Sequence, residues 1–152
     1  MKVQDVDSDY RVLILTPFGK DSQHVCKVLG AEGVHCLSCR DMNHLIAEIA
    51  TGAGAVLTTE EALGGKNGPL FIEALKQQPT WSALPVQIFY TQSAESDRFR
   101  GRISAVAEEI TDVSFLQRPV ASRTLVSSVR GALRDRKRQY QIRDLLDKLN
   151  ED

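Results

Sequence analysis

Five short apolar segments alternate with segments of helical periodicity along this 152-residue chain, and this alternation constrains the fold most. The first apolar segment, Val12–Leu15, has no polar residue between its members, which is typical of a strand buried on both faces of a parallel sheet. Because helical segments separate consecutive strands, we predict an α/β fold, a doubly wound five-stranded parallel sheet with right-handed crossovers. The other predicted strands are residues 34–38, 55–57, 84–90 and 113–116.

The predicted helices have recognisable ends. Asp21 and Ser22 are expected to cap the first helix, and Asp41 the second, which Gly52 ends. Pro69 marks the start of the third helix, and the last begins near residue 121. The fourth helix is predicted from apolar residues at spacings of four, three and four: Phe99, Ile103, Val106 and Ile110.

Bulk composition argues against two classes of partner. Nineteen basic and 20 acidic residues leave a net charge of −1, which disfavours nucleic-acid binding. The longest apolar stretches are only a few residues long, so we predict no membrane span. Three cysteines are an odd number in a chain large enough to be stable through its core, which predicts reduced thiols and a cytoplasmic location.

Charge is unevenly distributed along the chain. Residues 118–152 carry 9 basic and 5 acidic side chains, whereas the preceding residues are net acidic. We therefore divide the chain into three parts: a polar N-terminal segment (1–9), an α/β body (10–135) and a helical C-terminal extension (136–152).

The chemistry of such a fold is expected where the strands end, because open α/β sheets bind ligands at the carboxyl ends of their strands. A hydroxyl residue follows the fourth predicted strand, and Phe115-Leu116-Gln117-Arg118-Pro119 spans the end of the fifth. With five βα units of this length, these features resemble the receiver (CheY-like) domain of two-component response regulators over about residues 10–135. The resemblance implies the flavodoxin-like (βα)5 fold.

The resemblance also implies a phosphorylation site, and this sequence departs from it at the acidic positions. Receivers hold Mg²⁺ with two acids after the first strand, where this chain has Thr16 and Pro17, which cannot supply carboxylate oxygens. The phosphoacceptor aspartate corresponds to Thr59, or to Glu60 if the register shifts by one residue. A threonine is a poor acceptor without a general base, and a glutamate places its carboxylate one methylene too far.

At the remaining positions of the implied site, this sequence differs from the family's residues at some and matches them at others. The switch Ser/Thr corresponds to Tyr90 or Thr91, and Arg118 replaces the family's lysine, which keeps the charge but not the compact ammonium. Phe115 matches the aromatic switch position, and the resemblance implies a cis bond before Pro119.

We therefore predict a pseudo-receiver, a non-catalytic signalling module without metal or cofactor, because the metal-binding acids and the acceptor are lost together. Glu60 or Glu61 could pair permanently with Arg118 and imitate the phosphorylated state, and the alternative is two exposed acidic loop residues. Two rival functions stay open. One is a working receiver with an atypical acceptor, and the other is a small flavodoxin-like enzyme or nucleotide binder with a phosphate pocket of Thr16, Thr59, Thr91 and Arg118.

Potential soft metal ligands gather within 21 residues of the sequence. Cys36 and Cys39 have the C-x₂-C spacing of a zinc site, but no second pair follows. We expect Cys26 and Cys36 to pack as small hydrophobic residues, and Trp81 to pack beneath its turn. The other candidate ligands are His24, His35 and His44.

The last predicted helix continues well beyond the length usual for a receiver. We expect about four extra turns to project from the body, with the interleaved basic run forming a solvated face. This tail resembles the N-terminal receiver-like module of bacterial sensor or hybrid histidine kinases, which implies a kinase domain, in cis or in trans, or another signalling protein as partner. A seam for a homodimer is predicted from residues spaced by three, four and three: Gln139, Ile142, Leu146 and Leu149.

Overall fold

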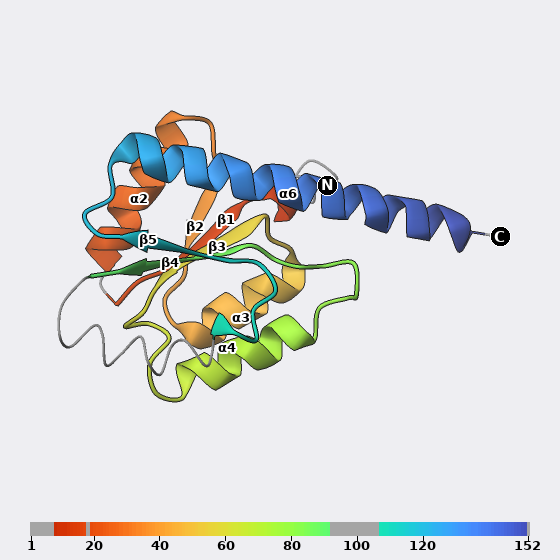
Figure 1. Ribbon diagram of the computed structural model, residues 1–152, viewed down its shortest axis with the longest axis horizontal. Helices are drawn as coiled ribbons and strands as arrows, with labels where there is room; N and C mark the ends of the chain where they lie inside the picture. The colour runs from red at the N-terminus through yellow and green to blue at the C-terminus, as the bar shows by residue number, and fades with distance from the viewer. Residues whose placement is uncertain (1–7, 18, 92–106, 152) are drawn as a thin grey trace.

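A computed structural model describes residues 8–17, 19–91 and 107–151 as one α/β sandwich (Figure 1). Five parallel strands form a sheet in the order β2-β1-β3-β4-β5, so the predicted fold class is confirmed. The strands are β1 (Val12–Leu15), β2 (Cys36–Ser38), β3 (Ala55–Thr59), β4 (Val86–Tyr90) and β5 (Val113–Gln117). The helices are α2 (Gly19–Ala31), α3 (Met42–Thr51), α4 (Asn67–Lys76) and α6 (Ser122–Leu149).

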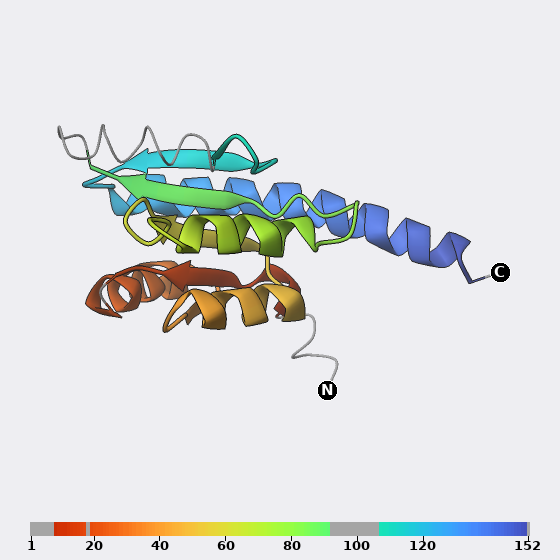
Figure 2. The same ribbon diagram turned by 90° about the horizontal axis from the view of Figure 1, so that it is seen from below.

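The sheet separates two apolar cores, and strand β1 shows why its sequence has no polar alternation. Helices α2 and α6 cover one face of the sheet, and α3 and α4 cover the other (Figures 1 and 2). Val12 and Ile14 belong to the core cluster that includes residues of α2 and α6, whereas Leu13 and Leu15 belong to the cluster that includes residues of α3 and α4. All four side chains are buried. Burial on both faces is expected for a parallel strand between two helical layers.

Both ends of α3 lie where the sequence predicted them, whereas the start of α2 does not. Asp41 caps α3 by accepting a 2.8 Å hydrogen bond from the backbone of His44, and Gly52 ends that helix at φ +144°. The predicted cap of the first helix is wrong, because α2 begins at Gly19 and leaves Asp21 in its first turn. The helix predicted through Phe99 lies mostly outside the described residues.

Helix α6 crosses the sheet and extends past it (Figure 2). The expected projection from residue 136 is too long, because Arg136 and Tyr140 are buried against the body and Arg143 still pairs with Asp9. The part of α6 that leaves the body is therefore shorter than predicted and begins after Arg143. Within the described ranges, no helix is long and apolar enough to cross a membrane.

Candidate functional site

The carboxyl ends of β1, β3, β4 and β5 bring the predicted site residues to one edge of the sheet. Thr16 follows β1, Thr59 ends β3, and Thr91 follows β4. Arg118 follows β5, and its backbone N–H donates to the carbonyl of Tyr90 in the adjacent strand at 2.7 Å. The parallel strands thus gather residues that are more than 100 positions apart in the sequence.

Arg118 makes the central polar contacts of this edge. Its Nε donates to Oγ1 of Thr91 at 3.0 Å, and its Nη2 donates to Oε2 of Glu61 at 2.7 Å. The neighbouring Glu60 is buried, and its Oε1 accepts from the backbone N–H of Thr91 at 3.2 Å. Glu61, not Glu60, therefore forms the ion pair that the sequence suggested, and we call Glu61, Thr91 and Arg118 the Arg118 triad.

The electrostatics of the Arg118 triad favour its charged form. Partial burial alone would raise the pKa of Glu61, but the hydrogen bond and charge of Arg118, together with hydrogen bonds from a backbone N–H and from Thr59, outweigh burial and lower that pKa. Glu61 is thus a carboxylate at neutral pH, and its ion pair with Arg118 persists without any added group. The pair is partly exposed, so its contribution to stability is modest.

The positions that correspond to metal ligands do not fit Mg²⁺, which needs several oxygen ligands in near-octahedral geometry. The hydroxyls of Thr16 and Ser22 lie 2.7 Å apart and share a hydrogen bond, and Pro17 offers no side-chain oxygen. Oγ1 of Thr59 accepts from the backbone N–H of Ala62 at 3.0 Å, as a turn-forming hydroxyl does. Across residues 8–17, 19–91 and 107–151, no group of three His, Cys, Asp or Glu side chains could hold a metal ion.

The two aromatic residues beside the site contact each other. The hydroxyl of Tyr90 donates to Oε1 of Gln117 at 3.5 Å, and its ring meets that of Phe115 edge-on at 6.2 Å between centroids. Phe115 is 42% exposed on the last strand of the sheet. The bond between Arg118 and Pro119 is cis, as the resemblance implied.

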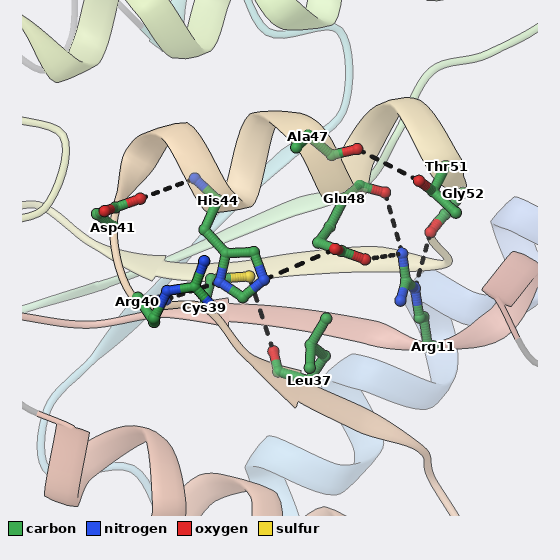
Figure 3. Close-up of polar contacts among 10 residues, drawn as sticks. All are labelled: Arg11, Leu37, Cys39, Arg40, Asp41, His44, Ala47, Glu48, Thr51 and Gly52. Atoms are coloured by element: carbon green, nitrogen blue, oxygen red, sulfur yellow. Dashed lines mark hydrogen bonds and ion pairs between the residues drawn. The ribbon is translucent and has the colours of Figure 1, made fainter.

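His44 belongs to a polar network that ties α3 to the sheet (Figure 3). Nδ1 of His44 accepts from the backbone N–H of Arg40 at 3.0 Å, and its Nε2 lies 3.6 Å from Oε2 of Glu48. Oε1 of Glu48 pairs with Nη2 of Arg11 at 2.7 Å, and Nε of Arg11 donates to the carbonyl of Gly52. Both nitrogens of His44 thus have partners within the chain, and the network acts as a structural tie.

The cysteines behave as packed apolar side chains. Cys26 and Cys36 pack against the core between α2 and the sheet, as predicted, and the Cys36 thiol donates to the carbonyl of Val34 at 3.8 Å. Burial raises the pKa of Cys36 to about 12 and that of Cys39 to about 11. Because thiolates and not thiols bind metals and attack electrophiles, these residues are poor ligands and nucleophiles at neutral pH.

A second polar centre lies at the opposite edge of the sheet, where α6 leaves the body, and the sequence analysis missed it. Arg136 is 2% exposed, and Nε of Arg136 donates to the carbonyl of Ala53 at 2.9 Å. Its Nη1 donates to Oγ of Ser82 at 2.6 Å and to Oε1 of Gln139 at 2.7 Å. All these acceptors are neutral, and burial lowers the pKa of Arg136.

Aromatic rings complete this centre. The guanidinium carbon of Arg136 lies 4.7 Å from the ring centroid of Tyr140 and 5.4 Å from that of Trp81. The guanidinium carbon of Arg143 lies 4.5 Å from the Tyr140 centroid, and the Tyr140 hydroxyl donates to the carbonyl of Ala53 at 2.7 Å. We call Trp81, Arg136, Gln139, Tyr140 and Arg143 the Arg136 clamp, because it fastens α6 to the loops that precede β3 and β4.

The clamp changes the interpretation of the predicted seam. The amide of Gln139 accepts from the backbone N–H of Ala83 at 2.8 Å and donates to its carbonyl at 2.9 Å, so Gln139 belongs to the body. The other predicted seam residues are exposed, with Ile142 at 50%, Leu146 at 42% and Leu149 at 76%. Leu145 is exposed beside them.

The sequence did contain a signal for the clamp. The buried stripe of α6 passes through Leu125, Val129 and Ala132, and continues at spacings of four to Arg136 and Tyr140. A basic run around Arg136 hid this continuation, because adjacent charged residues are typical of a solvated helix face.

Solved structures of low sequence identity share this fold. A CheY-like response regulator receiver domain protein from Methanospirillum hungatei JF-1 aligns with a TM-score of 0.65 and 16% identity over 86% of this chain and 98% of its own. Chemotaxis response regulator CheY4 of Vibrio cholerae aligns with a TM-score of 0.63 and 14% identity over 82% and 99%. The fold is that of CheY-like receiver domains. No protein-family model and no curated protein matches the sequence.

A longer protein shares the fold over part of its length. NtrX from Brucella abortus, solved in complex with ATP, aligns with a TM-score of 0.67 and 22% identity. The alignment covers 89% of this chain but only 29% of NtrX. At this identity the likeness shows the fold alone, so the chemistry must be argued from the residues of this chain.

Proposed function

We propose that this chain is a pseudo-receiver, a non-catalytic signalling module of a two-component pathway that passes a signal along α6. The observation that carries the proposal is the Arg118 triad. Its guanidinium donates to both the carboxylate and the hydroxyl at the edge of the sheet where the receiver-like fold implies phosphorylation, and no phosphoryl group is needed to bring them together.

The residues at that edge also lack the means to transfer a phosphoryl group. Such transfer depends on positioning and on electrostatic stabilisation, which metal ions provide in the enzymes that perform it. Thr16 and Pro17 fit no Mg²⁺ ion, and the hydroxyl of Thr59 already accepts a backbone hydrogen bond. The ion pair between Glu61 and Arg118 supports a state that stays fixed rather than one that responds to phosphorylation.

Intact-mass measurement tests this part of the proposal. We expect the full chain to keep its mass after incubation with Mg²⁺ and acetyl phosphate, while a phosphorylatable receiver treated in parallel gains about 80 Da. A stoichiometric gain of the same size on this chain would show a working receiver with an atypical acceptor and would overturn the pseudo-receiver assignment.

The exposed end of α6 supports a dimeric output. Ile142, Leu146 and Leu149 are apolar, exposed and spaced by four and three, as in one seam of a coiled coil. So short a seam is marginal by itself, and we propose that it adds to a homodimer or continues into a partner helix, such as that of a histidine kinase. The three free cysteines support a reducing compartment, for which we propose the cytoplasm.

Light scattering tests the dimer. We expect the full chain to have twice the monomer mass and Leu146→Glu to shift it toward the monomer. Gln141→Glu is the matched control, because Gln141 is exposed on the same helix outside the seam, and we expect it to stay dimeric. A monomeric mass for all three proteins would contradict the homodimer.

A further inference from the structure

A cavity of about 220 Å³ lies beside the Arg118 triad, between α2, the carboxyl ends of the strands and the start of α6. Thr16 and Thr59 contribute to it from β1 and β3, the two strands between which the connections change direction across the sheet. Ligands of open α/β sheets bind at this kind of position. Of the phosphate pocket that the sequence suggested, Thr16, Thr59 and Arg118 line this cavity.

Most of the cavity wall is apolar. Val25 from α2, Phe89 from β4 and Leu125 from α6 are buried side chains that line it, and Val28 and Val120 add half-buried apolar surface. Small-molecule pockets are typically lined in this way, with a few polar groups that fix the ligand's orientation. An occupant would gain most of its affinity by removing apolar surface from water.

The charges around the cavity do not favour an anion. Glu61 neutralises Arg118, and the remaining ionisable side chains of the lining are Asp21 and His24, both exposed on α2. Glu60 adds a further carboxyl group close to Thr91. Inorganic phosphate would therefore meet no surplus of positive charge at this site.

Arg118 presents a hydrogen-bond donor at the rim. Nε and Nη2 of Arg118 donate to Thr91 and Glu61, whereas Nη1 donates to no residue among those the structure describes. A carbonyl oxygen near the guanidinium could accept from Nη1 without breaking the pair with Glu61.

We propose that this cavity binds a small, uncharged, mostly apolar molecule that carries one carbonyl-type acceptor, with the acceptor at Arg118 and the apolar part against Phe89 and Leu125. This site does not depend on the proposed signalling role. It bears on that role in one respect, because Leu125 belongs to α6, the helix whose far end carries the exposed apolar residues.

Acetophenone is a suitable probe, because it combines a six-membered apolar ring with one carbonyl. With roughly nine non-hydrogen atoms it should bind with a Kd on the order of 1 mM. In titrations of the full chain followed by NMR, we expect saturable shifts at the methyl groups of Val25, Val120 and Leu125. Benzoate, which has the same ring with a charged head, should bind at least five-fold more weakly, and inorganic phosphate should cause no saturable shift.

Two pairs of variants locate the site. Val120→Phe fills the cavity and should weaken acetophenone binding more than ten-fold, whereas Val113→Phe, the same change at a half-buried valine outside the cavity, should leave Kd within two-fold. Arg118→Gln should weaken binding three- to ten-fold, as expected for one hydrogen bond. Arg130→Gln, which removes another surface ion pair, should have no effect.

Three results would overturn the proposal. Acetophenone shifts that do not saturate, or that are unchanged in Val120→Phe, would show that the cavity is not the binding site. Tighter binding of benzoate or phosphate than of acetophenone would show that the cavity selects anions. A mass gain with acetyl phosphate would contradict the pseudo-receiver role but leave this site standing, so the two failures are distinguishable.

Discussion

The two edges of the sheet each contain an arginine, but the two arginines differ in burial and in the kind of partner they contact. At the carboxyl edge, Arg118 is partly exposed and paired with the carboxylate of Glu61. At the amino edge, Arg136 is buried, with neutral acceptors and aromatic rings as its partners. A buried cation loses its hydration, and only well-placed hydrogen bonds and rings offset that cost. The buried cation, whose desolvation is costly, thus lies where α6 leaves the body.

This contrast affects how firmly α6 is held where it leaves the body. At the carboxyl edge the side chains are held by an ion pair of modest strength, whereas the start of the projecting part of α6 is held by several buried contacts at once. A clamp that joins α6 to the loops before β3 and β4 keeps the helix in one direction and one rotation. It also determines which way Ile142 and Leu146 face, as the proposed function of α6 requires.

The largest expected effect is the loss of Arg136. Arg136→Ala removes a fully buried side chain and its three hydrogen bonds, and we expect the free energy of unfolding to fall by about 3 kcal/mol. Arg138→Ala is the control, because the Arg138 side chain is 79% exposed and only its pair with Asp135 is lost. Urea denaturation measures both, and a loss below about 1 kcal/mol for Arg136→Ala would show that the two edges do not differ.

The second expected effect separates the hydroxyl of Tyr140 from its ring. Tyr140→Phe keeps the ring beside Arg136 and Arg143 but removes the 2.7 Å hydrogen bond to Ala53, which should cost about 1 kcal/mol. Tyr90→Phe removes the exposed 3.5 Å contact with Gln117 and should cost less than about 0.5 kcal/mol. Equal losses in the two variants would mean that burial does not strengthen the clamp.

The sequence predicted the carboxyl edge far better than the amino edge. Strand ends can be read from apolar runs, and parallel strands must bring their ends together, so the sequence was enough to place Thr16, Thr59 and Arg118 at one edge. The choice of Glu61 rather than Glu60 as the partner of Arg118 could not be read in this way. It depends on which side chain the turn after β3 directs outward.

The clamp escaped prediction because its evidence is spread over the chain. Trp81, Ala53 and Tyr140 are far apart in the sequence and become neighbours only in the folded chain, and Arg136 stands among other basic residues. The periodicity of the buried stripe in α6 indicates that Arg136 is buried, whereas a run of charged residues is typical of a solvated helix face. Long-range contacts of this kind override local patterns.

A smaller effect is expected for the pair at the carboxyl edge. In a double-mutant cycle, Arg118→Gln and Glu61→Gln should show a coupling of about 0.5 kcal/mol, the range of partly exposed ion pairs. The same cycle for Arg130→Gln and Glu32→Gln provides a comparison, since that pair is more exposed and longer, at 3.4 Å. A coupling above about 2 kcal/mol at Glu61 would make this edge as strongly held as the clamp.

The smallest expected effect is the pH dependence of that coupling. Because Arg118 holds the pKa of Glu61 below its usual range, the pair stabilises the folded chain above the unfolded-state pKa of about 4.3. This stability should disappear as the pH falls through the lowered pKa. We therefore expect the coupling measured at pH 7 to vanish near pH 2 and to weaken in high salt. The hydrogen-bond partners of Arg136 within the described residues are all neutral, so the loss caused by Arg136→Ala should change little over the same range. If the Glu61 coupling survived at pH 2, the contact would be a neutral hydrogen bond, and the triad would not imitate a phosphoryl charge.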